Sequence, residues 1–515
     1  MVARQQVRRV LLGGVMGLAG LAFAAIPPAS ARSSVTVRTI SFSAPLVALG
    51  VDQAAGLAVV AGGDKARRRV SLLDARTGTP RFGVTLTGVL WAPVEIGPAS
   101  TLAIDERNAR AYVTTYAHIG PYGPTRGYVN VIDTQHGTLL NAVAAPSAGG
   151  TGKCHLPGPA GLPVSLTVDS RTGRLFVINS ALPSPRPRGS MTIIDARTGS
   201  PVGEILRGQE PEPYAATTDP QTGHVFVVGQ PTDSKGAARA PAYLRLLDGG
   251  DGHILRTISL PHGGDEVAMA SHLARLILLG VPNRAFEADY VTTVDTHKGT
   301  IVRAVPLASA PDATMALDEA ADRTFVTYST GERDGGGDYR ATVAVLDIRR
   351  GALRRIVPLR GLPTNIVVDT ARAHVFVEMQ HADGTGTNNV PATIAMLDAR
   401  SGAVLHTAVV GRNAGPVVVD GRAGRLFVAA AGPIATDYPF GPPEGDGNLS
   451  VLDTATGKVV ARVPLGVNPT DIDLAGPPGH IVVLSRGGSI PDRRSHQRWA
   501  AHIAPGTVSL IGVVP

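Results

Sequence analysis

Short runs in which hydrophobic and polar residues alternate cover almost the whole chain, and they end in two recurring phrases. In the first phrase the run reaches Leu-Asp or a close variant, and Gly follows four residues after the Asp, as in VSLLDARTG. In the second phrase a Val- and Ile-rich run reaches Asp, a few turn residues follow, and Phe-Val or Tyr-Val opens the next run, as in TVDSRTGRLFV. Period-two alternation bounded by Gly, Asp and Pro predicts β-strands. The first phrase ends at Gly78, Gly137, Gly199, Gly252, Gly299, Gly351, Gly402 and Gly457.

Each repeat therefore contains four short antiparallel strands, which we name a, b, c and d. Strand a ends at the Asp of the second phrase, b contains Phe-Val, c ends at Leu-Asp, and d is a V-x-L run such as IVRAVPL. Intervals of roughly fifty residues are typical of propellers and other repeat architectures. An Asp side chain accepts turn N–H groups and Gly tolerates positive φ. Because the same Asp serves the same turn in every repeat, we interpret these aspartates as structural.

The two ends of the chain predict a closed ring. A lone d-like strand, Val35 to Phe42, precedes the first a strand, and a c-like strand, Thr507 to Val514, ends the last repeat without a d strand. Pairing the two completes the last sheet and removes its open edge. We predict an all-β, single closed β-propeller of nine four-stranded blades, with seven or eight as the alternative because the Asp is replaced in two repeats. The a strands end near Asp52, Asp105, Asp169, Asp219, Ala270, Asp318, Asp369, Asp420 and Leu474.

Composition agrees with one large β domain. The 61 Gly and 40 Pro residues suit many short strands and turns, and a charged fraction of 17% suits a large buried core. A chain of 515 residues would ordinarily suggest several domains. Here the repeats extend over nearly all of it, so we assign residues 32–515 to one propeller domain.

The repeated phrases resemble the YVTN-type β-propeller repeat. The resemblance rests on PTNIVVD, HVFV, VAVLD and VVARVPL, and it covers about Val35 to Val514. The family is found in exported bacterial and archaeal proteins, in the periplasm and in surface layers. It is similar in architecture to lactonase-type and lyase-type propellers and to propeller subunits of amine dehydrogenases. The long loops and extra blades of this chain depart from the best examples.

The N-terminus has the pattern of a secretory signal peptide. Arg4, Arg8 and Arg9 precede an apolar run from Val10 to Ile26, and Ala29-Ser30-Ala31 offers a small-residue cleavage site. The run is too short for a membrane anchor. We predict that residues 1–31 are removed and that the protein is exported by the general secretory or the twin-arginine route, leaving no membrane span in the mature chain.

Charge and motifs exclude several function classes. The formal charge of +7 is modest for this length, and the Arg clusters fall in predicted loops without interleaved aromatic residues, so nucleic acid is not an expected partner. Cys154 is the only cysteine, which excludes an intrachain disulfide. We interpret it as an unpaired thiol in a Gly- and Pro-rich loop. The sequence contains no G-x-S-x-G, H-E-x-x-H or Walker-type motif.

Variation between the repeats is concentrated in the connection from b to c. Equivalent connections of a ring lie at one end of it, and variable loops on a rigid scaffold commonly form binding surfaces. The long b–c connections are predicted at residues 62–69, 116–127, 180–189, 230–242, 282–289, 329–340, 380–391, 431–447 and 486–506.

The d–a connections lead into the innermost strands, so their polar residues should surround the mouth of the central channel. We predict Asp265, Asp312, Asn365, Asn413 and Asn468 as the residues that bind any small ligand. Carboxylates at this mouth would suit Ca²⁺, although acidic residues at a solvated rim need no ligand. Further candidates at matching places are Glu210, Glu212, Glu266, Thr364 and Asp471.

Two functions remain open. The first is an exported, non-catalytic propeller that binds a protein, a glycan or a cell-envelope component through the b–c loops and the channel mouth, which we expect to act as a monomer. The second is a lactonase-like or lyase-like enzyme, or the propeller subunit of a dehydrogenase, with a metal at the channel mouth. No catalytic residue and no required cofactor can be named from spacing alone, and we favour the binding function.

Overall fold

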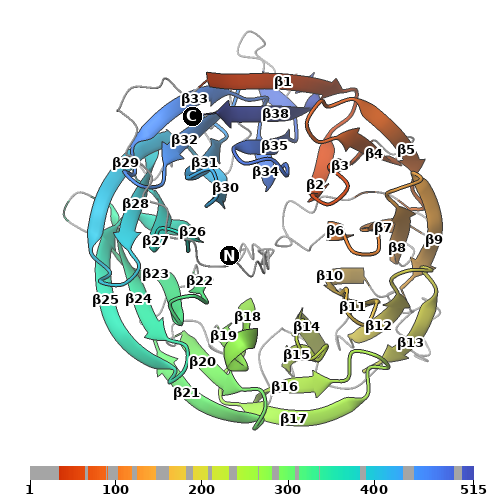
Figure 1. Ribbon diagram of the computed structural model, residues 1–515, viewed down its shortest axis with the longest axis horizontal. Helices are drawn as coiled ribbons and strands as arrows, with labels where there is room; N and C mark the ends of the chain where they lie inside the picture. The colour runs from red at the N-terminus through yellow and green to blue at the C-terminus, as the bar shows by residue number, and fades with distance from the viewer. Residues whose placement is uncertain are drawn as a thin grey trace, which may run out of the picture.

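The computed structural model is a ring of nine four-stranded antiparallel sheets around a central channel (Figure 1). The prediction of a nine-bladed all-β propeller is confirmed. The structure describes residues 34–63, 68–88, 90, 102–118, 125–145, 162–180, 189–206, 212–230, 241–264, 266–280, 289–307, 313–333, 335, 337–382, 390–432, 446–491 and 501–514.

In each blade the four strands follow one another from the innermost to the outermost. Blade 1 is β2 (Leu46–Asp52), β3 (Leu57–Gly63), β4 (Arg68–Asp74) and β5 (Pro80–Thr85); blade 2 is β6 (Leu102–Asp105), β7 (Arg110–His118), β8 (Thr125–Asp133) and β9 (Thr138–Ala144); blade 3 is β10 (Leu162–Asp169), β11 (Arg174–Ser180), β12 (Ser190–Asp195) and β13 (Pro201–Ile205). Blade 4 is β14 (Glu212–Thr218), β15 (Val225–Gln230), β16 (Ala242–Leu247) and β17 (Ile254–Leu260); blade 5 is β18 (Glu266–Ala270), β19 (Arg275–Gly280), β20 (Tyr290–Asp295) and β21 (Thr300–Pro306), with the 3₁₀ turn η1 (Ser271–Leu273) between β18 and β19. Blade 6 is β22 (Thr314–Asp318), β23 (Arg323–Arg333), β24 (Tyr339–Asp347) and β25 (Ala352–Arg360); blade 7 is β26 (Leu362–Asp369), β27 (His374–Gln380), β28 (Pro391–Asp398) and β29 (Val404–Arg412). Blade 8 is β30 (Ala414–Asp420), β31 (Arg425–Ala430), β32 (Asn448–Asp453) and β33 (Val459–Pro464); blade 9 is β34 (Pro469–Leu474), β35 (His480–Ser485), β38 (Gly506–Val514) and β1 (Ser34–Phe42).

The N-terminal strand closes the ring, as predicted. β1 pairs antiparallel with β38 in an unbroken register from Ser34 opposite Val514 to Phe42 opposite Gly506. The first and last segments of the propeller therefore lie side by side at the top of Figure 1. Ile40 and Phe42 pack against the hydrophobic cluster that joins blade 9 to blade 1. Closure thus combines a strand ladder with apolar burial, and it covers an edge that would otherwise be free to pair with another chain.

The core is divided among the seams between blades. Nine hydrophobic clusters of the described residues each join two adjacent blades, including the seam between the last blade and the first. The aromatic residue of the second sequence phrase enters these clusters from strand b. Burying such a side chain contributes on the order of 1.5–3 kcal/mol. The largest of these side chains, each at most 2% exposed, are Tyr112, Phe176, Phe226, Phe325, Phe376 and Phe427.

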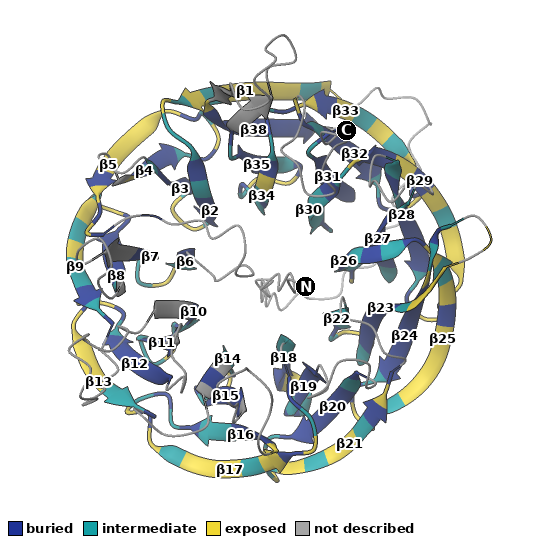
Figure 2. Cartoon of the chain, turned by 180° about the vertical axis from the view of Figure 1, so that it is seen from behind, coloured by how far each residue is buried: buried dark blue, intermediate teal, exposed yellow. Residues whose placement is uncertain are grey.

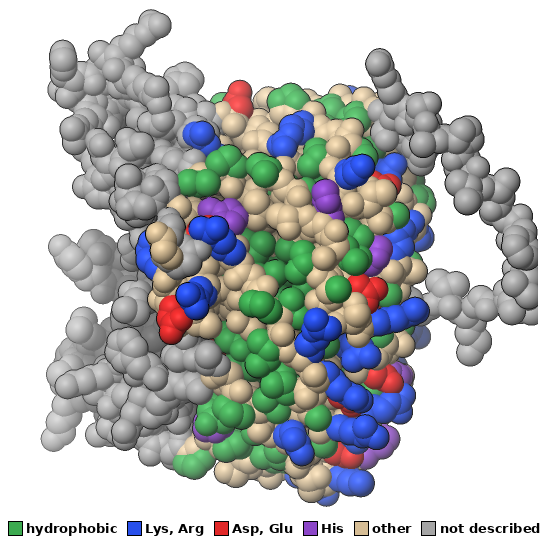
Figure 3. Space-filling model, turned by 90° about the vertical axis from the view of Figure 1, so that its left-hand side faces the viewer, with side chains coloured by type: hydrophobic (Ala, Val, Ile, Leu, Met, Phe, Trp, Pro, Cys, Tyr) green, Lys and Arg blue, Asp and Glu red, His purple; other side chains and the backbone are tan. Residues whose placement is uncertain are grey.

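The two ends of the ring are built differently. At one end, which we call the turn face, a joins b and c joins d through tight turns; at the other, the loop face, b joins c and d leads to the next blade. Figure 3 shows Lys, Arg and His side chains gathered toward one end of the ring, on the side that faces the viewer. Basic residues that belong to the tight turns include Arg349, Arg350, Arg372 and Arg400.

The outermost strands form an exposed rim (Figure 2). Most of their residues are exposed or half-buried: in β25 only Val357 is buried, while Leu353 and Ile356 are 39% and 53% exposed. The structure also extends strands into several predicted loops, including 62–69 and 116–127. In blade 6, β23 and β24 run into the predicted 329–340 loop, and β36 (Gly488–Pro491) pairs with β37 (Ala501–Ala504) inside the predicted 486–506 loop. The first pair lengthens the β23–β24 hairpin of its blade, whereas β36 and β37 form a separate two-stranded sheet.

Among the residues that the structure describes, no helix has the length and apolar character needed to cross a membrane. Residues 1–31, the predicted signal peptide, lie outside these residues, and its removal stays a prediction.

Candidate functional site

The repeated aspartates of the a–b turns are deeply buried hydrogen-bond acceptors. Asp105 Oδ1 accepts the N–H of Asn108 at 3.2 Å and the Ser170 hydroxyl of the next blade at 2.9 Å. In blade 8, Asp420 Oδ2 accepts the N–H of Gly479 from blade 9 at 2.7 Å. Each of these two carboxylates thus contacts the following blade, and the Asp105 carboxylate also fixes its own turn. Burial raises the pKa of Asp318, an equivalent residue that is 1% exposed.

The aspartates of the c–d turns are more open and are paired with N–H groups and cations. Asp398 Oδ1 accepts the N–H and the hydroxyl of Ser401, at 2.6 and 2.7 Å. These bonds from Ser401 lower the pKa of the Asp398 carboxyl. In blade 3, Arg174 pairs with Asp195 at 2.6 Å and donates to the Gly250 carbonyl of blade 4 at 3.1 Å. At this turn, the ion pair and the hydrogen bond of Arg174 therefore stabilise the blade and join it to the next one.

The predicted channel-mouth residue Asn365 belongs to a buried polar cluster at the seam of blades 7 and 8. Its Nδ2 donates to Glu378 Oε2 at 2.6 Å and to the Gly415 carbonyl at 2.7 Å. Gln380 Nε2 donates to Glu378 Oε1 at 3.2 Å and to the Ala414 carbonyl at 2.7 Å. Asn365 and Glu378 are 3% and 1% exposed. The carboxylate is therefore held by two amides, and each amide also contacts the inner strand of blade 8.

The other two predicted asparagines lie at tight turns in blades 8 and 9. Asn413 and Asn468 have φ of 50° and 57°, a left-handed conformation that Asn adopts more readily than most residues. The Asn413 side chain donates to the Gly432 carbonyl at 2.6 Å, and the Asn468 carbonyl accepts the N–H of Arg486 at 2.9 Å. Asn365, Asn413 and Asn468 thus occupy consecutive blades and contact their own surroundings, while their ligand-binding role stays a prediction.

Acidic candidates of the inner strands connect adjacent blades. Glu266 accepts the N–H of Met315 at 3.1 Å, and Asp471 accepts the N–H of Leu49 at 3.1 Å across the closing seam. These carboxylates therefore serve as ties between neighbouring inner strands. Thr364 lies beside Asn365 with its buried Oγ1 unpaired among the described residues.

The remaining acidic candidates cannot be placed. Asp265, Asp312 and Glu210 lie outside the described residues, and of Glu212 only the backbone in β14 is described. Within the part of the chain that is described, no three His, Cys, Asp or Glu side chains are grouped as metal ligands. The prediction of Ca²⁺ at the channel mouth therefore stays a prediction.

A chain of hydrogen bonds joins blades 6 and 7 near the loop face. Asp338 Oδ2 lies 2.7 Å from His381 Nδ1, and His381 Nε2 lies 2.8 Å from Thr393 Oγ1. Asp338 also accepts the N–H of Ala382 at 3.1 Å. A carboxylate that orients an imidazole beside a hydroxyl is an arrangement that can activate the hydroxyl. No sequence signal marks this arrangement, because the three residues belong to two blades and to no short motif.

The fold is shared with solved structures of diverse function. The sequence matches no protein-family model and no curated protein. In structure the chain is similar to a europium-containing methanol dehydrogenase, with 12% identity, 93% of each chain covered and a TM-score of 0.50. It is also similar to the dihydro-heme d1 dehydrogenase NirN in complex with DHE, with 14% identity, 83% of this chain and 78% of that chain covered, and a TM-score of 0.50. A eukaryotic initiation factor structure gives 12% identity, 83% and 90% coverage and a TM-score of 0.52. Likeness at these identities shows the propeller fold alone.

Proposed function

We propose that this protein is an exported, non-catalytic β-propeller, with YVTN-type repeats, that binds a protein, a glycan or a cell-envelope component through its loop face and channel mouth. The main support for this proposal is the difference in length between the connections at the two ends of the ring. At the turn face, β26 ends at Asp369 and β27 begins at His374, and similar short turns recur around the ring. At the loop face, β3 and β4 are separated by residues 64–67 but β31 and β32 by residues 431–447.

The physical argument concerns what each end can accommodate. The turn-face aspartates make turn contacts that recur from blade to blade, so substituting these aspartates disturbs the scaffold. Loop lengthening at the other end costs only about 0.6 kcal/mol per doubling of length. A partner can therefore be recognised by sequence variation in the loops without altering the ring. Export, through the general secretory or the twin-arginine route, and a monomeric state are part of the proposal.

The test is site-specific photo-crosslinking in the envelope of the native host. Glu332 and Arg350 are a matched pair in blade 6, because Glu332 is the next-to-last residue of β23 at the loop face and Arg350 lies in the c–d turn at the opposite end. Both residues are exposed. A crosslinking residue at position 332 should give a specific adduct, while one at position 350 should not. Adducts from position 350 alone would overturn the assignment of the working face.

Shortening the 431–447 and 486–506 connections to tight turns gives a second measurement. Adduct formation should fall while thermal unfolding of the ring changes little. Adducts that persist at the wild-type level after both deletions would contradict a role for these loops.

A hydrolytic enzyme is the second candidate, and it rests on the Asp338–His381–Thr393 chain. In such a reaction Thr393 Oγ1 would attack an ester or lactone carbonyl while His381 Nε2 takes its proton; the carbonyl–oxygen bond to the alcohol breaks, and His381 passes the proton to the departing oxygen. Water would then cleave the acyl-enzyme to the acid and restore the Thr393 hydroxyl. The variants His381→Gln and Thr393→Val distinguish this from binding. They should abolish any lactone or ester turnover, and they should leave crosslinking from position 332 unchanged. The metal-dependent lactonase, lyase or dehydrogenase alternative predicts turnover that chelation removes.

A further inference from the structure

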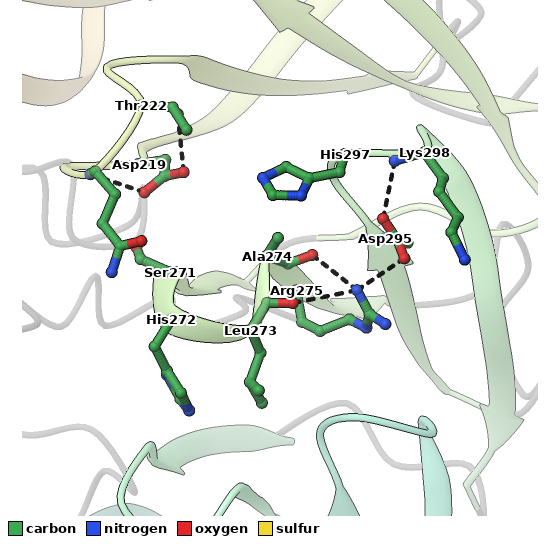
Figure 4. A pocket seen from close by; sticks show the side chains of 11 residues that line it. Asp219, Thr222, Ser271, His272, Leu273, Ala274, Arg275, Asp295, His297 and Lys298 are labelled. Atoms are coloured by element: carbon green, nitrogen blue, oxygen red, sulfur yellow. Dashed lines mark hydrogen bonds and ion pairs between the residues drawn. The ribbon is translucent and has the colours of Figure 1, made fainter.

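A cavity of about 250 Å³ lies on the turn face at the seam of blades 4 and 5 (Figure 4). Its walls are the a–b turn of blade 4 and the a–b and c–d turns of blade 5. Asp219 and Thr222 come from blade 4, and Ser271, Arg275 and His297 come from blade 5. Because the cavity is at the opposite end of the ring from the proposed working face, its role is independent of the proposed function.

The cavity occurs where the repeat departs from its pattern. In blade 3, Ser170 follows the turn aspartate and donates to Asp105 of the preceding blade at 2.9 Å. Ser271 holds the same place in blade 5, after Ala270 instead of an aspartate. Here the turn is the 3₁₀ segment η1, closed by Ala274 at φ 50°.

The contact that Ser170 makes with the preceding blade has no counterpart at Ser271. Ser271 is 6% exposed, and its Oγ has no hydrogen-bond partner in the part of the chain that the structure describes. Ser271 and Asp219 line the same cavity. A buried hydroxyl without a partner is unfavourable, so a molecule that supplies the missing partner would be stabilised here.

The charged groups of the walls are largely occupied and balance one another. Asp219 accepts the N–H of Gln221 at 3.0 Å and the Thr222 hydroxyl at 2.8 Å. On the other side, Arg275 pairs with Asp295 at 2.9 Å. Figure 4 shows the His297 imidazole between Asp219 on one side and the Arg275–Asp295 ion pair on the other. His272, in contrast, points away and contacts Glu319 of blade 6 at 3.0 Å.

Because groups of both charge signs line the cavity, we expect it to bind a charged ligand less well than a neutral one. An anion would approach the buried Asp219 carboxylate, while a cation would approach Arg275 and the nearby Lys298. A neutral molecule with several hydroxyl groups avoids both penalties, because each hydroxyl can donate to Asp219 and accept from Ser271 or His297. The cavity is smaller than the roughly 300–1,000 Å³ of pockets for drug-sized ligands, which limits the occupant to about one ring.

We propose that this cavity binds one neutral sugar residue, with Ser271 Oγ and His297 among its hydrogen-bond partners. The ligand is either a free monosaccharide or the terminal residue of a glycan, since the two present the same hydroxyl groups. The opening at the turn face, where His297 and Lys298 are exposed, leaves room for a glycan chain to continue into solvent.

The test is isothermal titration of the full-length exported protein. The neutral probes are glucose, galactose, mannose and N-acetylglucosamine; glucuronate, glucosamine and inorganic phosphate are the charged comparisons. At least one neutral probe should bind with Kd on the order of 1 mM, more tightly than every charged probe. Ser271→Ala and His297→Ala should each weaken binding about fivefold to tenfold, the effect of one lost hydrogen bond. A disaccharide ending in the preferred sugar tells the two sources apart, since it binds equally well only if a glycan terminus is accommodated.

Ser170→Ala is the matched control. It removes the equivalent serine at a seam where the hydroxyl is engaged, so it should lower the melting temperature and leave sugar binding unchanged. Ser271→Ala should leave the melting temperature unchanged and lose affinity, which separates a ligand role from a folding role. The proposal is overturned if no neutral sugar binds up to about 10 mM, if a charged probe binds best, or if both cavity variants bind like the wild type.

Discussion

Replacing Asn365 by alanine decides between a structural role and a ligand-binding role for a predicted channel-mouth residue. The change removes the hydrogen bond to the Glu378 carboxylate at 2.6 Å and the one to the Gly415 carbonyl at 2.7 Å. A hydrogen bond to a charged group contributes about 1.5–3 kcal/mol and one to a neutral carbonyl about 0.5–1.5 kcal/mol. Because Glu378 is 1% exposed, water cannot readily replace the lost donor. We expect Asn365→Ala to lower the free energy of unfolding by about 2–4 kcal/mol.

Urea titrations of the wild type and the variant measure this difference. Asn413→Gly is the control, since glycine adopts the same positive φ and only the bond to the Gly432 carbonyl is lost, at a cost of about 1 kcal/mol or less. A change below about 0.5 kcal/mol for Asn365→Ala would refute the structural interpretation. If that small change came with loss of partner or ligand binding, the side chain would belong to a recognition site.

Three further changes test the ring itself. Deleting residues 32–43 removes β1 and exposes the edge of β38, so calorimetry should show a lower melting temperature and light scattering more aggregation; an unchanged melting temperature would contradict closure by this strand. Bonds from Ser401 lower the pKa of Asp398 below its ordinary 3.8, so the stability that this carboxylate supplies is present above pH 3.8 and is lost as the pH falls through the folded pKa. In urea titrations Asp398→Asn should therefore be less stable than the wild type at pH 7, and this difference should shrink as the pH is lowered below 3.8. Phe427→Ala removes a fully buried aromatic side chain and should cost about 3–5 kcal/mol by the same method, and a cost below about 1 kcal/mol would contradict its place in the core.

The strands and the closure could be predicted because their signals are local. An Asp followed four residues later by Gly marks the same turn in eight of the nine repeats, and the spare strand at the N-terminus matches the missing strand at the C-terminus. The contacts between blades could not be predicted in this way. Glu266 and Met315, which are hydrogen-bonded, lie one repeat apart, and no local pattern in the sequence relates their positions.

The candidate site shows the same limit. Asn365 is predictable from its place near the start of the inner strand β26, but its partner Glu378 lies in strand b, where other repeats have an apolar or small polar residue. The sequence shows that Glu378 is charged, but only the fold shows that the side-chain amides of Asn365 and Gln380 both donate to its carboxylate. The chain from Asp338 to Thr393 is likewise assembled from two blades.

Departures from the repeat are informative because the repeat itself satisfies the scaffold. Where the pattern of turn residues holds, as in blade 3, the Ser170 hydroxyl joins two blades through its bond to Asp105. Where it fails, as at Ala270, the seam keeps a cavity and the Ser271 hydroxyl is left unpaired among the described residues. Sequences that fold well tend to agree with their structure at every level, and local disagreements concentrate at functional or strained sites. In the sequence, the replacement of one turn aspartate is only an irregularity in counting blades. In the structure it marks the seam that contains the cavity. Ser271→Ala, which should change sugar affinity, and Ser170→Ala, which should change the melting temperature, distinguish a ligand-binding role from a role in blade packing.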